Sequence, residues 1–295
     1  KTTDLLNNVE MPRSSGYTTA LRNIGSIRNS GFELQLDGRI IDRAVKWDLG
    51  VNFSLNRSKV LVLSEDKDIF GGELDNTILK DQLNLMRVGE PMYVFYGYVE
   101  DGYDENGHIV YKNMDDDPAI TAADKTIIGD PNPDFLVNLT TAVSYKGFTL
   151  SAFFQSSIGN DIYSLSMAAQ AYDYGYNGNT LREVYYNHWT PENPTAKYPN
   201  LDQTSYKMSD RFVYDGSFVR LKNLELAYDV PCARNKFIKR ARVYVSAQNL
   251  FTITSYPFWD PDINANGGGS SMIQGVDSYC YPSARTYTIG CRLTF

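Results

Sequence analysis

The last eleven residues of the chain, Arg285 to Phe295, alternate strictly between two kinds of side chain. One face of such a strand carries Tyr287, Ile289, Cys291, Leu293 and Phe295, and the other carries polar or small residues. A soluble protein with this exposed apolar edge would risk aggregation. In a transmembrane β-barrel, one face meets lipid, the other meets a wet interior, and aromatic residues lie at the interface. The terminal segment therefore predicts a transmembrane β-barrel.

The composition is compatible with a barrel and excludes several other classes. No run of about 18 apolar residues exists, which excludes a transmembrane helix. The net charge is −7 and no cluster of Lys and Arg stands out, so we expect no nucleic-acid partner. Cys232, Cys280 and Cys291 are widely spaced and lack a CxxC pair, which indicates neither a disulfide framework nor a zinc site.

Six further segments repeat the period of two. They span residues 30–41, 44–60, 134–146, 148–158, 218–228 and 242–253. In the fifth segment the apolar phase changes between Leu221 and Leu224, which predicts a β-bulge near Lys222 and Asn223. The stretch from Asn84 to Val99 could supply an extra pair of strands. The predicted fold class is an all-β, antiparallel transmembrane barrel with about seven strands in this chain.

The connections between these strands alternate sharply in length. Short ones fall at about 41–44, 145–148 and 229–241, and long ones at 61–133, 159–216 and 255–284. Outer-membrane barrels place short turns in the periplasm and long loops outside the cell. This predicts a periplasmic C-terminus at Phe295. Long loops also favour a wide barrel over an eight-stranded one, whose interior is filled by side chains.

Ordered motifs along the chain resemble the C-terminal part of SusC/RagA-like TonB-dependent outer-membrane transporters. The resemblance runs from about Leu5 to Phe295. The matching stretches are NIGSIRNSGFELQL (23–36), VNFSLNRSKVLVL (51–63), VFYGYVEDGY (94–103), IIGDPNPDF (127–135), HWTPENP (188–194), YDGSFVRLKNLELAYDVP (214–231), RVYVSAQNLFTITSYPFWDPD (242–262) and YPSARTYTIGCRLTF (281–295).

This resemblance implies a 22-stranded barrel, an N-terminal plug domain, energy supplied through TonB, and a SusD-like surface lipoprotein that acts as a lid. Residues 1–295 would then be the C-terminal portion of the barrel. The chain opens at Lys1 without an export signal, which agrees with a missing N-terminal part. We therefore expect the plug and the TonB-contacting segment to lie outside this sequence.

An acidic stretch in the first long connection has the spacing of a calcium-binding loop. Its candidate ligands, at positions 1, 3, 5, 9 and 12, are Asn113, Asp115, Asp117, Thr121 and Asp124. It departs from the calcium pattern at position 6, which is Pro118 instead of Gly, and at position 12, where an Asp replaces the longer Glu. The alternatives are a structural calcium ion and a solvated acidic surface loop.

Aromatic residues crowd the second and third long connections. Flat rings beside side-chain amides suit the faces and hydroxyls of sugars, and they equally suit peptides or packing against a lid protein or another loop. The candidate ligand-binding residues are Tyr172, Tyr174, Tyr176, Tyr185, Tyr186, Trp189, Tyr256 and Trp259. Asp260 and Pro261 follow the last of these and predict a turn.

Catalysis has little support in the sequence. His108 and His188 are the two histidines, and neither a GxSxG nor an HExxH motif occurs. The favoured hypothesis is a nutrient importer of the bacterial outer membrane that takes up an oligosaccharide or an oligopeptide. The alternatives are a passive pore or adhesion barrel, and an outer-membrane enzyme. The sequence does not separate glycan from peptide substrates.

Overall fold

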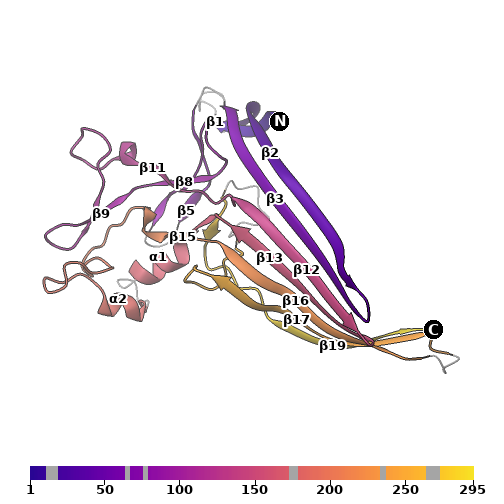
Figure 1. The fold of residues 1–295 in the computed structure, drawn as a ribbon. Coiled ribbons are helices and arrows are strands. Elements are labelled where there is room, and N and C mark those ends of the chain that lie inside the picture. The colour runs from indigo at the N-terminus through magenta and orange to yellow at the C-terminus, as the bar shows by residue number, and fades with distance from the viewer. Residues whose placement is uncertain (11–18, 64–66, 76–78, 173–178, 233–236, 264–272) are drawn as a thin grey trace.

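The computed structural model describes residues 1–10, 19–63, 67–75, 79–172, 179–232, 237–263 and 273–295. Its largest element is an eight-stranded antiparallel sheet that forms a long, open wall (Figure 1). In spatial order the wall strands are β1 (Thr2–Glu10), β2 (Thr19–Asp42), β3 (Val45–Leu63), β12 (Phe135–Tyr145), β13 (Phe148–Ile158), β16 (Phe218–Val230), β17 (Arg240–Thr254) and β19 (Thr286–Thr294). The sheet does not close on itself, because β1 and β19 lie at its two edges.

The seven strands predicted from the sequence are all present in the wall, and β1 is an eighth that the sequence analysis missed. The pairing of β1 with β2 shifts register on both sides of Leu5, and such a shift breaks the alternation on which the prediction relied. The stretch 84–99 does form an antiparallel pair, but this pair belongs to a separate small sheet outside the wall.

The pairing registers place apolar side chains in continuous rows on one face of the wall. One row crosses six strands and contains Trp47, Val143, Leu150, Leu226, Val245 and Ile289. The next row, on the opposite face, contains Asp48, Ala142, Ser151, Glu225, Ser246 and Thr288. Leu150 and Val245 are about half exposed, at 48% and 47%. An apolar face of this extent is the lipid-facing surface of a barrel wall.

The predicted bulge keeps this apolar face continuous. On both sides of β16 the pairing shifts register between Leu221 and Asn223, so Lys222 has no directly opposite partner. The extra residue returns Leu224 and Leu226 to the face that Leu221 occupies. The prediction made from the phase change is thus confirmed.

The three long connections leave the wall at the same end, and together they form what we call the cap (Figure 1). The first connection contains β4 (Ile69–Phe70), β5 (Glu73–Asp75), β6 (Lys80–Gln82), β7 (Asn84–Met86), β8 (Val94–Gly97), β9 (Glu100–Tyr103), β10 (Ile109–Tyr111), the 3₁₀ turn Ala122–Asp124 and β11 (Thr126–Gly129). The second contains β14 (Asp161–Ser164), α1 (Leu165–Tyr172), α2 (Arg182–Tyr186), the 3₁₀ turn Asp210–Phe212 and β15 (Val213–Asp215), and the third contains β18 (Val276–Asp277). None of the helices in the described residues is long and apolar enough to cross a membrane.

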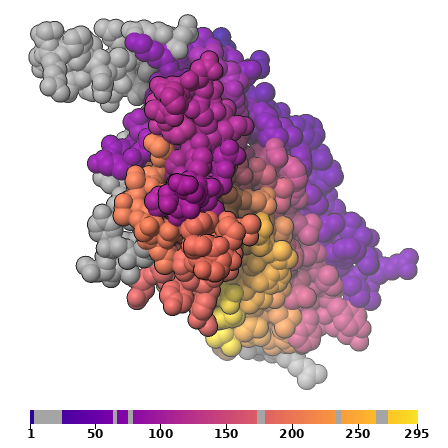
Figure 2. Space-filling view, turned by 90° about the vertical axis from the view of Figure 1, so that its left-hand side faces the viewer, coloured from indigo at the N-terminus to yellow at the C-terminus, as the bar shows by residue number. Residues whose placement is uncertain are grey.

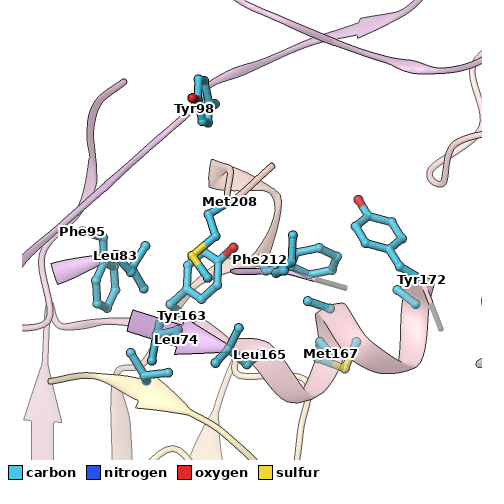
Figure 3. Packing of buried hydrophobic residues seen from close by; sticks show 14 of the residues in the cluster. Leu74, Leu83, Phe95, Tyr98, Tyr163, Leu165, Met167, Tyr172, Met208 and Phe212 are labelled. Atoms are coloured by element: carbon cyan, nitrogen blue, oxygen red, sulfur yellow. The ribbon is translucent and has the colours of Figure 1, made fainter. Parts of the chain in front are cut away.

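The cap has a hydrophobic core of its own. Residues from all three connections meet in it: Leu83 and Phe95 from the first, Tyr163 and Phe212 from the second, and Val276 from the third. Figure 3 shows Phe95, Leu83, Tyr163 and Met208 packed together beside helix α1. The face-on view in Figure 2 shows the first connection, in purple and magenta, directly against the second, in salmon and orange. The long connections are therefore parts of one folded body.

A charge placed on the apolar face should destabilise the wall. We expect Leu226→Arg in the full-length protein to cost about 2–4 kcal/mol if it lies near the bilayer midplane. Ser151→Arg is the matched control, because Ser151 lies on the polar face opposite Glu225. Denaturant titration of the protein in lipid vesicles measures both. Equal stability of the two variants would contradict the assignment of faces.

Candidate ligand-binding and partner-binding surface

A partly buried ion pair joins the first two connections of the cap. Arg211 Nε donates to Glu100 Oε2 at 2.7 Å, and Ser209 Oγ donates to Glu100 Oε1 at 2.6 Å. Backbone bonds run alongside, from Tyr98 N–H to Met208 O and from Asp210 N–H to Tyr98 O. Burial lowers the pKa of Arg211, but the bond to Glu100 and the nearby charges of Glu100, Tyr172 and Tyr103 together raise the pKa by more, so the guanidinium stays charged. This cluster holds the first two connections in a fixed relation.

Trp189 packs against the hairpin between β9 and β10. Gly107 in that hairpin has φ +78°, and a Cβ added there would overlap the Trp189 ring. Asn200 fixes the same turn, since its N–H donates to Gly107 O at 2.9 Å and its Nδ2 donates to Asn106 O at 2.9 Å. The Trp189 ring therefore contacts another loop, which was one of the alternatives for this residue.

Tyr172 and Tyr256 also pack inside the cap. Tyr172 is 3% exposed and stacks on Tyr206 with ring centroids 3.8 Å apart. Tyr256 is 4% exposed and donates to Asp277 Oδ2 at 2.6 Å. Burial is the main cause that raises the pKa of both phenols above the usual range. In this arrangement neither ring is open to a ligand.

Three of the predicted aromatic residues present exposed rings. Tyr185 and Tyr186 on α2 are 62% and 64% exposed, and their rings pack edge to face with centroids 5.2 Å apart. The guanidinium of Arg182 lies 5.6 Å from the Tyr186 ring centroid. Trp259 in the third connection is 56% exposed and stacks on Phe258 at 4.7 Å. Tyr174 and Tyr176 lie outside the described residues.

Arg220 anchors the third connection to the polar face of the wall. The side chain of this β16 residue is almost fully buried and forms an ion pair with Asp260. Arg220 also donates to Thr252 Oγ1 at 2.9 Å and to Ser283 Oγ at 3.1 Å. Asp260 was predicted only as a turn residue, and its pairing with Arg220 was not predicted. An arginine near the start of a strand, with an Asp-Pro-Asp motif later in the chain, was the available signal.

The carboxyl group of Asp260 is held in its charged form. Burial alone would raise the pKa of Asp260, but N–H groups of Ser283 and Asp262 and the Arg220 guanidinium outweigh it and lower the pKa. A lowered pKa in the folded state stabilises the fold above the unfolded pKa of about 4, and this contribution is lost as the pH falls through the lowered value. The anchor is therefore complete at neutral pH.

The acidic stretch with calcium-like spacing folds onto its own backbone. Asn113, Asp115 and Asp117 each accept an N–H from the residue two positions later, at 3.1, 2.9 and 3.0 Å. Asp124 accepts from Met114 N–H and Thr121 N–H, both at 2.7 Å, and these bonds lower the pKa of Asp124. Within the described residues, no three His, Cys, Asp or Glu side chains converge to hold a metal ion. Calcium binding by this stretch stays a prediction for metal analysis.

The whole chain, with both its wall and its cap, is similar to known proteins. The chain is 32% identical to TonB-dependent receptor P3 of Formosa agariphila over 317 residues, which cover 100% of the chain and 31% of that protein. It is 29% identical to TonB-dependent receptor SusC of Bacteroides thetaiotaomicron, covering 100% of the chain and 29% of SusC. No family model matches.

The chain is a homologue of the C-terminal part of TonB-dependent receptors. The solved structure of the RagAB peptide importer in its closed-closed state superposes with a TM-score of 0.81 at 27% identity, over 99% of this chain and 32% of the other. The chain thus spans about a third of the length of the relatives it matches. TonB-dependent receptors are outer-membrane proteins, which accounts for the apolar face of the wall.

Removing the Arg220 anchor should release the third connection. Arg220→Met leaves Asp260 buried without its ion-pair partner, which costs about 3–5 kcal/mol. Lys222→Met is the control, because Lys222 is 37% exposed and 3.9 Å from Asp262. We expect faster protease cleavage within 255–284 for Arg220→Met alone, at neutral pH. Equal cleavage of both variants would contradict the anchor.

Adding a methyl group at Gly107 should displace Trp189. Gly107→Ala combines a strained positive φ with the overlap on the indole ring. Gly102→Ala is the matched control, because Gly102 has φ +96° and open space around its Cβ position. We expect the indole emission of Gly107→Ala to be shifted further to the red than that of Gly102→Ala. This difference should disappear when Trp189 is also replaced by Phe in both variants. Identical spectra for the two glycine variants would show that the ring does not pack there.

Proposed function

We propose that the full-length protein containing this chain is an active nutrient importer of the bacterial outer membrane. The observation that carries the proposal is the wall itself. Its strands present unbroken apolar rows on one face and polar rows on the other, and this suits a conduit through lipid. The similarity to TonB-dependent receptors supports import as the activity, because these relatives match the whole chain.

In this proposal the cap lies outside the cell and the short turns lie in the periplasm. The support is the difference in length, since barrels of this class carry their long loops on the outer side. The turn between β12 and β13 contains only Lys146 and Gly147, whereas the described residues of 159–216 form two helices, a 3₁₀ turn and two strands of the cap. Phe295 then ends in the periplasm.

The proposed partners are inferred from the similarity to TonB-dependent receptors. Energy would come through TonB, which would contact the part of the protein that precedes Lys1. A SusD-like surface lipoprotein would cover the cap, and exposed Tyr185 and Tyr186 on α2 are suited to contact it or the ligand. The imported molecule would be an oligosaccharide or an oligopeptide. The RagAB structure is that of a peptide importer, whereas SusC is named only as a TonB-dependent receptor.

A transporter is better supported than an enzyme, because the matched proteins are receptors and transporters. A passive pore is the remaining alternative, and the energy source separates it from an importer.

The test is uptake by cells that express the full-length protein. Two probes are used, a pool of labelled oligosaccharides and a pool of labelled oligopeptides. We expect one pool to accumulate, and we expect uptake to fall at least about tenfold in cells without TonB, because uphill transport needs an energy input. Undiminished uptake in those cells would instead favour a passive pore. An empty-vector strain is the control.

A further inference from the structure

A polar cavity lies between the wall and the third connection. Its volume is about 250 Å³. The floor is formed by the polar face of β12 and β13, and the roof by Pro261, Asp262 and Ile263 of the cap. Pro131 and Asn160 lie at its rim, where the first and second connections meet the wall. All three connections thus contribute to one enclosure on the polar side of the sheet.

Two side-chain amides form the floor. Asn138 and Gln155 are directly opposite each other on β12 and β13, and Gln155 is in turn opposite Arg220 on β16. Within the described residues, Oδ1 of Asn138 is buried and has no hydrogen-bond partner. Side-chain amides both donate and accept hydrogen bonds, so Asn138 and Gln155 together suit a molecule in the cavity that carries hydroxyl or amide groups.

The charges around the cavity are already compensated. Asp262 is the carboxylate in its lining, and it lies 3.4 Å from Arg220 Nη1 and 3.9 Å from Lys222 Nζ. Ser157 Oγ donates to Asn160 Oδ1 at 2.7 Å, which orients the rim. Because the lining is otherwise composed of amides, hydroxyls, prolines and apolar groups, it suits an uncharged group better than an ion.

A second cavity continues along the same face. Its volume is about 210 Å³, and it shares Pro133 and Leu136 with the first. Its polar lining is uncharged and comes from Asn29, Ser54, Asn56, Ser58 and Asn132. Two adjacent enclosures of similar size and chemistry are suited to successive units of one oligomer.

We propose that the cavity over Asn138 and Gln155 is a binding subsite for an uncharged, hydroxyl- or amide-bearing unit of the transported molecule. This inference rests on the proposed importer function and adds the place and chemistry of one contact. The Arg220 and Asp260 anchor would be a positioning element, because it holds the roof of the subsite over the wall.

The experiment compares Asn138→Leu with Thr140→Leu in the full-length protein. Leu matches Asn in size but has no polar atoms. Thr140 lies two residues further along the same face, is exposed, and does not line the cavity, so it controls for added apolar surface. The probes are neutral labelled oligosaccharides and end-capped peptides without charged side chains. These two arms distinguish sugar hydroxyls from peptide amides.

We expect the concentration for half-maximal uptake to rise about fivefold or more in Asn138→Leu, since a typical hydrogen bond contributes this much. Thr140→Leu should match the wild type. If the wild type imports a probe and Asn138→Leu has the same concentration dependence, the proposed subsite is wrong but the proposed importer function is retained. If the wild type imports neither probe, both the subsite and the importer function are contradicted.

A second variant tests whether the cavity is open in the whole protein. We expect a small uncharged thiol reagent to label Asn138→Cys, in a background without other reactive cysteines, and an imported probe to slow this labelling. Complete protection without any probe would show that another part of the polypeptide fills the cavity, which would overturn the subsite.

Discussion

A strand that crosses lipid must hydrogen-bond its backbone to neighbouring strands, because hydrocarbon offers no other partner. The wall meets this requirement between β1 and β19 through an unbroken series of antiparallel pairs. The same pairing fixes which side chains share a face, so a single slip of register would move apolar residues into the polar interior. The bulge at Lys222 is therefore a requirement of the fold, since it restores the phase that the sequence of β16 would otherwise lose.

The cap obeys a different constraint. Its connections have to satisfy their polar groups and bury apolar ones without help from lipid, and they do so by sharing one core. Tyr163 and Leu83 in that core are essentially inaccessible to solvent, although they come from connections that are far apart in sequence. Partly buried polar contacts such as Glu100 with Arg211 lie beside the apolar ones. A body built this way resists independent movement of its loops, because moving one would expose the core of all three.

These two constraints explain which features the sequence could reveal. A period of two is local, so the strand at 148–158 and the bulge beside Leu224 were predictable from neighbouring residues alone. The contacts of the cap are not local. Nothing near Trp189 indicates Gly107, and nothing near Tyr256 indicates Asp277, so aromatic residues that pack loops together were grouped with those that remain exposed. Only burial separates Tyr172 from Tyr185, and burial is a property of the folded chain.

Wall and cap differ in what stabilises them, and the polar face of the sheet is where they have to meet. Apolar contacts are poorly suited to this junction, because an exposed hydrophobic patch there would disturb the hydrated interior of the barrel. An arginine on the wall solves the problem, since its guanidinium satisfies several acceptors at once. Arg220 joins Thr252 of the wall to Asp260 and Ser283 of the third connection. The cap is thus fixed to the wall by directional bonds, which set its position and leave the surrounding surface polar.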